Sequence, residues 1–381
     1  MSALWFILIV AVLLVLQAKL YKENIFKNLM IERKFEKNTV FPGDTTVLKL
    51  IVYNKKFFPV TYLKLQQKLP VELEMKRSQL VEKHDKVKYL HYTVYSLFPF
   101  QKITRKFELV ASKRGIYNLF DGIRAFSTDL FGSQEYEKEF MAPARLVVYP
   151  RLIDLKNFKV IANSVYGDLF VKRWIIEDPV IISGIRDYTN SDSFKSINWK
   201  ATAKTQKLKV NKYDYTADKK ILILFNVDFH RYILRTDEVE KFEKAIEVAA
   251  TLSVNLIQEG IPVGLSTNAI CLVDGDYTYI EPSAGEGQIS RLLEIFAGMS
   301  FLKKYSKEDI ISYISKVLPW GTDLLIVTPF VDEELLALAG KFFSDREVMI
   351  LCMDLKGIEK VFSNVKVFYY NEEGKEIEVV G

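Results

Sequence analysis

The sequence predicts an α+β protein of several domains: an N-terminal transmembrane helix, an antiparallel β-sandwich and a doubly wound α/β sheet. Three observations predict it. An apolar run opens the chain, strand-like segments separated by turn residues continue to about residue 150, and strands alternate with helices after residue 219. A chain of 381 residues is long enough for two or three domains. We place the domain boundaries at residues 1–20 (anchor), 21–150 (sandwich), 151–215 (linker) and 216–381 (α/β domain).

The first element is the predicted membrane anchor. Residues Ala3 to Leu16 are apolar apart from the indole N–H of Trp5, and with the flank to Leu20 they approach the roughly 20 residues that span a bilayer. The alternative is a cleaved signal peptide, which has basic residues before the run and a small-x-small site after it, and neither is present here. Basic residues follow the run instead, so the positive-inside rule predicts a single-pass plasma-membrane protein whose C-terminal bulk is cytoplasmic.

The next part reads as a set of strands. Partial alternation with β-branched and aromatic enrichment predicts strands at 46–53, 61–69, 89–96, 103–111 and 116–126. Turn residues such as Pro42-Gly43 and Arg114-Gly115 separate the candidate strands. Short strands at this spacing favour an antiparallel, immunoglobulin-like sandwich, which is more often a spacer or docking module than a catalyst.

After residue 219 the pattern changes to alternating strands and helices. We expect strands at 221–227, 261–265, 323–327, 348–352 and 365–370, and helices at 238–258, 286–299, 307–318 and 332–343. The run 277–280 reads as an antiparallel edge strand. Such an order is typical of a doubly wound sheet.

Between these domains lies a signature segment, Ser183 to Lys204, which mixes charges of both signs with apolar anchors. Its spacing resembles the signature of the bacterial family called domain of unknown function 58. The matching positions are Arg186, Tyr188, Asp192, Lys195, Ile197, Trp199, Lys200, Ala201, Ala203 and Lys204. Ile185, Ser191 and Lys195 depart from the family's usual Leu, Gly and Arg, and a lysine does not replace the bidentate fork of an arginine.

Two earlier motifs extend this resemblance. Residues 113–117, Lys-Arg-Gly-Ile-Tyr, and 128–132, Thr-Asp-Leu-Phe-Gly, look like the family's basic-Gly-x-Tyr and Asp-Pro-Phe-Gly pair, with Leu130 in place of proline. On this basis the resemblance runs from about residue 30 to the end of the chain. It implies a von Willebrand factor A-like C-terminal domain and a MoxR-type AAA+ ATPase as partner.

The signature segment has two interpretations. In the favoured one, Trp199 and Ile197 pack between the domains, Asp192 precedes a short helix that runs through Lys200, and Trp199→Ala costs about 3 to 5 kcal/mol if the ring is fully buried. In the other, Arg186 and three lysines form a basic face that grips an acidic partner or a phosphate. A stability change near zero in Trp199→Ala would indicate an exposed ring, and therefore a candidate contact.

The resemblance also implies a cation loop after the first strand of the C-terminal domain, where the family fold can hold a divalent ion on an Asp-x-Ser-x-Ser turn. The equivalent residues here are Asn226, Asp228 and His230. Asparagine and aspartate offer oxygens, but imidazole is a poor magnesium ligand. The loop is therefore a degenerate site for Mg²⁺ or Ca²⁺, and the alternative is a strand-end loop without a cofactor.

Other chemistry has little support. A net charge of +5, from 53 basic and 48 acidic residues, is too small an excess for a nucleic-acid binder. The three histidines offer few acid–base candidates, and no phosphate-binding glycine loop or nucleophile elbow occurs in the sequence. We therefore expect a non-enzymatic, membrane-anchored adaptor that docks a MoxR-type AAA+ ATPase for the maturation or remodelling of a membrane or envelope client. The alternatives are a metal-dependent enzyme for a phosphorylated or envelope-related substrate, and an outward-facing envelope scaffold.

Overall fold

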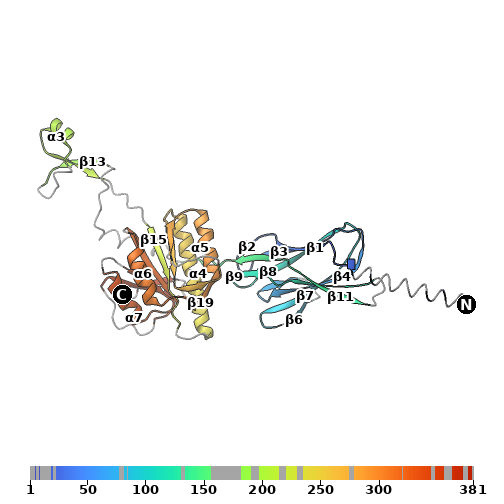
Figure 1. The fold of residues 1–381 in the computed structure, drawn as a ribbon. Coiled ribbons are helices and arrows are strands. Elements are labelled where there is room, and N and C mark those ends of the chain that lie inside the picture. Colours follow the sequence, from blue (N-terminus) through green and yellow to red (C-terminus); the bar gives the residue numbers. More distant parts are fainter. Residues whose placement is uncertain are drawn as a thin grey trace. The chain divides into compact units, whose positions relative to one another are not determined.

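The structure is a computed structural model. It describes residues 5, 8, 19, 23–76, 81–83, 85–129, 134–155, 182–189, 197–213, 220–229, 235–273, 279–319, 321–344, 348–355, 363–371 and 376–379. The chain forms two compact units: Met1–Leu152 with Ile270–Gly275 and Ser290–Ser300, and Ile153–Ala269 with Asp276–Ile289 and Phe301–Gly381. Figure 1 shows the sandwich strands, the α/β sheet and the small element around α3.

The predicted transmembrane run lies outside the described residues, except for Trp5 and Leu8. Among the helices that the structure describes, none combines the length and the apolar character needed to cross a bilayer.

The first unit contains the predicted antiparallel β-sandwich. One sheet has the order β1-β3-β8-β5 and the other β11-β10-β4-β7-β6. The strands of the first sheet are β1 (Leu29–Phe35), β3 (Thr45–Asn54), β8 (Lys102–Ala111) and β5 (Leu73–Met75). Those of the second are β11 (Glu135–Phe140), β10 (Ile123–Thr128), β4 (Val60–Pro70), β7 (Lys88–Leu97) and β6 (Val81–Lys83). A third sheet joins β2 (Thr39–Val40), β12 (Ala144–Val148) and β9 (Gly115–Leu119).

Alternation places one face of each long strand in the sandwich core. In β3, Leu50 and Val52 are fully buried, and they share a hydrophobic cluster with Leu63 and Leu65 of β4. Side chains from the two sheets therefore interdigitate, as period-two patterning requires. The strand predicted at 116–126 is wrong in one respect, because the chain turns at residues 120–122 and forms β9 and β10 in different sheets.

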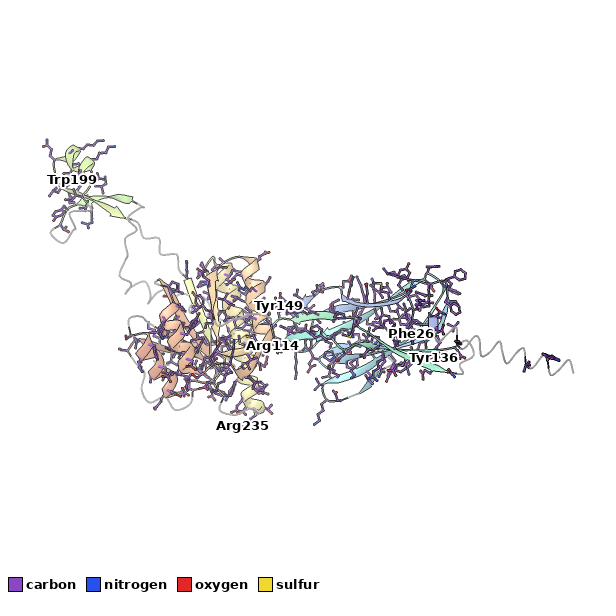
Figure 2. The ribbon with its side chains drawn as sticks, in the orientation of Figure 1. Phe26, Arg114, Tyr136, Tyr149, Trp199 and Arg235 are labelled. Atoms are coloured by element: carbon purple, nitrogen blue, oxygen red, sulfur yellow. The ribbon has the colours of Figure 1, made fainter. Side chains whose placement is uncertain are left out.

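The motif at residues 113–117 has a structural role within the first unit. One guanidinium nitrogen of Arg114 donates hydrogen bonds to the carbonyl oxygens of Phe296, Ala297 and Met299, at 2.8, 3.0 and 3.1 Å. Carbonyls at the end of a helix lack intrahelical partners, so an arginine there satisfies acceptors that would otherwise need water. Figure 2 labels Arg114.

The second unit contains a mixed, mainly parallel sheet of seven strands in the order β18-β16-β15-β20-β21-β22-β23. Its parallel strands are β16 (Val263–Thr267), β15 (Lys220–Phe225), β20 (Thr322–Thr328), β21 (Val348–Cys352) and β22 (Val365–Asn371). The edge strands β18 (Ile280–Ser283) and β23 (Glu376–Val379) are antiparallel to their neighbours. The predicted edge strand at 277–280 is thus real but begins later, and β23 was not predicted.

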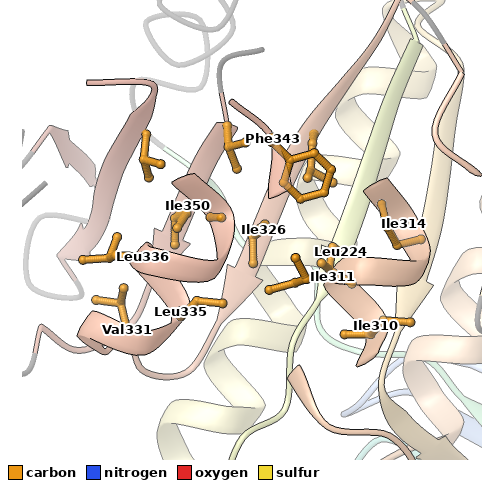
Figure 3. Close-up of a cluster of buried hydrophobic side chains, with 14 of the residues drawn as sticks. Leu224, Ile310, Ile311, Ile314, Ile326, Val331, Leu335, Leu336, Phe343 and Ile350 are labelled. Carbon is orange, nitrogen blue, oxygen red and sulfur yellow. The ribbon is translucent and has the colours of Figure 1, made fainter. Parts of the chain in front are cut away.

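Helices cover both faces of this sheet. On one face, α6 (Lys307–Val317) and α7 (Glu333–Phe342) pack their apolar sides on Leu224, Ile326 and Ile350, as Figure 3 shows. On the other face lies α4 (Thr236–Gln258), whose Phe242 meets Phe225 edge-on, with ring centroids 6.1 Å apart. Strands buried on both sides read as continuous apolar runs, which is why β15 and β21 could be recognised.

The remaining helices and strands of the described residues are α5 (Glu286–Gly298), the pair β17 (Ala269–Cys271) and β19 (Met299–Lys303), and the elements of the signature segment.

In the seven-stranded sheet, β15 lies between β16 and β20, both parallel to it. Strand order reverses here, so the loops leaving β15, β16 and β20 meet at one edge, where open α/β sheets usually bind ligands.

Candidate functional site

The signature segment is part of a small element of two strands and one short helix. We call its described residues, 182–189 and 197–213, the signature element. β13 (Ile182–Asp187) pairs antiparallel with β14 (Lys209–Tyr213), and α3 (Trp199–Thr205) precedes β14. The side chain of Asn198 caps α3 by accepting from the backbone N–H of Ala201 at 3.0 Å. The predicted helix around 192–200 is therefore misplaced, because Asn198 provides the cap and the helix begins at Trp199.

The two apolar anchors of this signature element differ in burial. Ile197 is buried and bridges to Val210 of β14, which is also buried. Trp199 is 66% exposed, and α3 contains no buried residue. Ile197 therefore packs within the element, whereas the ring of Trp199, labelled on α3 in Figure 2, is exposed on it. Packing of either side chain between domains stays a prediction. Because Asn198 is the N-cap, Trp199 occupies the first helical position of α3.

The signature element carries a strong positive charge. By sequence, residues 182–213 hold seven basic residues and two acids, a net charge of +5. Lys209 pairs with Asp187 at 2.7 Å, and this hydrogen bond holds the pKa of that carboxyl below its usual range. Since the whole chain also has a net charge of +5, the rest of the chain is balanced overall. The positive charge excess is therefore concentrated here.

Exposed apolar side chains accompany these charges. Besides Trp199, the element exposes Ile185 (53%) and Leu208 (43%). Arg186 donates to the backbone oxygen of Asp187 at 3.2 Å, and the side chain of Tyr188 is half-buried. Asp192 and Lys195, also predicted for this surface, lie outside the described residues. Tryptophan and arginine are enriched in protein-binding surfaces, whereas lysine belongs to their polar rim.

A second cluster of charged side chains lies at the edge of the sheet where β15 ends. The ammonium of Lys307 lies 2.9 Å from Asp228, 2.7 Å from Asp332 and 2.5 Å from Glu334. Lys303 binds the other oxygen of Asp228 at 2.9 Å. We call these five residues the Lys307 cluster.

Secondary structure positions each member of the Lys307 cluster. Asp228 follows β15, Lys307 is the first residue of α6, and Asp332 caps α7 by accepting from the N–H of Leu335 at 2.8 Å. Glu334 lies in the first turn of α7. Acids in the first turn of a helix are favoured by its dipole, whereas a cation there is not. Lys307 is thus placed against the dipole of its own helix and needs the carboxylates around it.

The electrostatics of the cluster follow from burial and pairing. Burial by itself would raise the pKa of Asp228, but hydrogen bonds from Lys307 and Lys303 outweigh it and the pKa is lowered. Burial likewise opposes charging of Lys307, yet its hydrogen bonds to Asp332, Glu334 and Asp228 raise its pKa. Both groups are therefore charged at neutral pH.

Asn226, the other predicted cation ligand, belongs to a buried amide network. Its Oδ1 accepts from Nδ2 of Asn268 at 3.1 Å, and its own Nδ2 lies 3.4 Å from the hydroxyl of Thr328. Asn268 also accepts from the N–H of Val227 and donates to the carbonyl of Val227, so it closes the loop after β15. Asn226 and Asp228 thus have different partners, and His230 lies outside the described residues.

Sequence reasoning missed Lys303, Lys307, Asp332 and Glu334. One signal was available, since the carboxyl ends of neighbouring parallel strands meet at one edge, and Asp332 follows β20 just as Asp228 follows β15. The lysines had no such signal, because they come from the far end of β19 and the start of α6.

The comparisons with known proteins support the family resemblance. Residues 184–354 match the family described as "Protein of unknown function DUF58". The predicted family is therefore confirmed for this stretch, whereas the match does not reach the earlier motifs at 113–117 and 128–132. The "Uncharacterized protein YeaD" of Bacillus subtilis is 21% identical over 346 residues, which cover 88% of this chain and 79% of that protein.

Solved structures give a weaker likeness. A cohesin of Acetivibrio cellulolyticus ScaC, in complex with a dockerin, has a TM-score of 0.23 at 10% identity and covers 31% of this chain and 99% of its own. A non-cellulosomal cohesin from Archaeoglobus fulgidus has a TM-score of 0.22 at 9% identity. The match covers 35% of this chain and 96% of the cohesin. Scores this low carry no argument about what this chain binds.

Proposed function

We propose that the protein is a non-enzymatic, membrane-anchored adaptor whose signature element docks an acidic surface of a MoxR-type AAA+ ATPase. The observation that carries this proposal is the exposure of Trp199 on a helix that also bears Lys200 and Lys204. The sequence left two roles open for this segment: packing between domains, or a basic face that binds a partner. An exposed ring favours the second, and we call this surface of α3 the docking face. Maturation or remodelling of a membrane or envelope client would follow from recruiting such an ATPase.

The choice of an acidic partner rests on charge. Seven basic residues against two acids within residues 182–213 attract a surface of opposite sign and raise the rate of encounter. Exposed Trp199, Ile185 and Leu208 supply apolar area that a partner can bury. An acidic, partly apolar protein surface fits both features.

Family analogy supports the remaining parts of the proposal. The strand order β18-β16-β15-β20-β21-β22, with an antiparallel edge, is that expected of a von Willebrand factor A-like domain. Members of the resembling family accompany MoxR-type ATPases, and the apolar run at residues 3–16 would anchor the chain with its bulk in the cytoplasm. The docking experiment therefore identifies the partner directly.

The metal-dependent enzyme is less well supported. Its cation would need oxygens from Asp228 and Asn226, but Lys303 and Lys307 bind both carboxylate oxygens of Asp228. The Oδ1 of Asn226 accepts a hydrogen bond from Asn268. This donor set does not fit a resident divalent ion, and we derive no reaction through one.

The test is affinity capture of the intact chain in mild detergent, with the captured proteins identified by mass spectrometry. We expect an AAA+ ATPase with the intact chain, and loss of at least about tenfold of it with the variant Lys200→Glu, Lys204→Glu, because charge reversal at an interface repels the partner. The matched control is Lys316→Glu, Lys341→Glu, which makes the same charge change on exposed lysines of α6 and α7. Equal capture by both double variants would refute the docking face.

A reporter fused after Gly381 tests the topology. The adaptor requires the C-terminus in the cytoplasm, where an ATPase has access to ATP. A reporter on the outer side would exclude the ATPase as partner and favour the envelope scaffold.

A further inference from the structure

The side chain of Lys307 is only 7% exposed, so its positive charge is buried at the edge of the sheet. Isolated buried ammonium groups are rare, because losing water costs several kcal/mol. Lys307 makes three ion pairs of 2.5 to 2.9 Å, to Asp228, Asp332 and Glu334. Each of its three N–H donors therefore has a carboxylate acceptor.

The three carboxylates have the arrangement of a cation site. Asp228, Asp332 and Glu334 each offer an oxygen, and these oxygens lie within 4.8 Å of one another. They come from the ends of β15 and β20 and the start of α7, where the strand order of the sheet reverses. Of the acidic, histidine and cysteine side chains among the described residues, these three carboxylates are the group placed to hold a metal ion.

The contacts of Lys307 have the lengths expected of an ammonium group rather than of a metal ion. Magnesium binds oxygen at about 2.0–2.1 Å and calcium at about 2.3–2.6 Å, whereas charge-assisted N–H···O bonds are about 2.7–2.9 Å long. Two of the three contacts of Lys307 lie in the last range, at 2.7 and 2.9 Å. A divalent ion could enter only if the buried side chain of Lys307 left.

We infer that Lys307 is a built-in cation that replaces a divalent ion at this edge of the sheet, so that the end of β15 and the starts of α6 and α7 are held together without metal. The inference is independent of the signature element and of its partner. It explains why a lysine occupies the first position of α6, where the helix dipole disfavours a cation. It also explains why Asp228 occurs in a loop that lacks the hydroxyl ligands of a metal site.

The inference predicts that removing the ammonium uncovers a metal site. In Lys307→Met the stem keeps most of its length and apolar packing, while three carboxylates lose their common partner. Mutual repulsion then favours any divalent cation that binds between them. We expect Lys307→Met to bind Mn²⁺ at least about tenfold more tightly than the natural chain, with a dissociation constant on the order of 1 mM or below, as for weak carboxylate sites.

The experiment measures Mn²⁺ binding by electron paramagnetic resonance for the natural chain, Lys307→Met, and Lys307→Met with Asp228→Asn. The control is Lys316→Met, which changes an exposed lysine of the same helix. The inference expects Lys307→Met to bind Mn²⁺ at least about tenfold more tightly than the natural chain and the control, and the double variant to lose that gain. A folded Lys307→Met that binds no more Mn²⁺ than the control would overturn it.

A measurement on the natural chain keeps the inference testable if Lys307→Met fails to fold. The melting temperature of the natural chain should be the same in EDTA and in millimolar Mg²⁺, Ca²⁺ or Mn²⁺. A rise with any of these ions that Asp228→Asn abolishes would show that a metal displaces Lys307, and would overturn the inference. Partner capture is a separate readout, so failure of this inference leaves the proposed docking face untouched.

Discussion

The sandwich contains a buried histidine that should make its stability depend on pH. His91 lies in β7, is 2% exposed, and packs edge-on against Phe107 with ring centroids 4.7 Å apart. Its Nδ1 lies 3.0 Å from Nε2 of Gln67. An amide nitrogen can only donate, so Nδ1 accepts and the ring is neutral. Burial, helped by the charge of Arg105, lowers the pKa of His91 to about 4.

The sign of the pH effect follows from this shift. The unfolded chain has an ordinary histidine pKa of about 6.5, so above that pH neither state is protonated and His91 adds no pH dependence. Between pH 6.5 and 4 the unfolded state binds a proton that the folded state excludes, and stability falls as the pH falls. The difference of about 2.5 pKa units, at 1.36 kcal/mol each, corresponds to a loss of about 3 kcal/mol by pH 4.

The assay has two parts. Imidazole NMR gives the pKa of His91 directly. Hydrogen exchange of the β4 and β7 peptides in urea, between pH 4.5 and pH 7, gives the local free energy of unfolding. The natural chain and Thr93→Ser, a neighbouring control that keeps His91, should lose stability with acid, and His91→Asn should lose about 2 kcal/mol less over this range. An imidazole that titrates near pH 6.5, or equal slopes in all three proteins, would refute the reasoning.

Three further changes test the packing described above. Arg33 is 2% exposed and donates to three carbonyl oxygens at 2.7 to 3.0 Å, so Arg33→Met should lower the free energy of unfolding by about 3 to 5 kcal/mol, measured in urea. A Cβ at Gly264 would lie 2.5 Å from the carbonyl oxygen of Ile280, so Gly264→Ala should cost about 1 to 3 kcal/mol and speed hydrogen exchange in β18. Trp199→Ala should change the unfolding free energy by less than about 0.5 kcal/mol, since the ring is 66% exposed; a loss above about 2 kcal/mol would show that the ring is buried.

Much of the fold could be predicted from the sequence because its strongest signals are local. Strand β15 is apolar from Ile221 to its end because helices cover both faces of its sheet, and α4 shows the helical spacing of Phe242, Ala245 and Ala249. The break between β9 and β10 was missed, because Phe120 is 65% exposed and extends the aromatic pattern across a turn. Periodicity alone does not distinguish an exposed aromatic residue in a turn from one in a strand.

The candidate sites were harder to predict, because their chemistry depends on contacts between distant residues. Asp228 could be singled out from its loop, but its partners Lys303 and Lys307 come from elements far along the chain. Whether Trp199 is buried could not be predicted either. The residue at which α3 begins decides which of its side chains face the strands, and the sequence did not give that residue correctly. Asn198 rather than Asp192 caps α3, and the anchor that is buried is Ile197.

The two charged regions should respond differently to salt, because they differ in exposure. The basic side chains of the signature element include exposed Lys200, Lys204 and Lys207, whose attraction to a partner is screened within a Debye length of about 8 Å at physiological ionic strength. The ammonium of Lys307 is buried against its carboxylates and is screened far less. Added salt should therefore release an acidic partner while the folded sheet edge keeps its ion pairs. A partner that stays bound at high salt would have to be held mainly by Trp199 and its apolar neighbours, which places the interaction energy in aromatic burial rather than in charge.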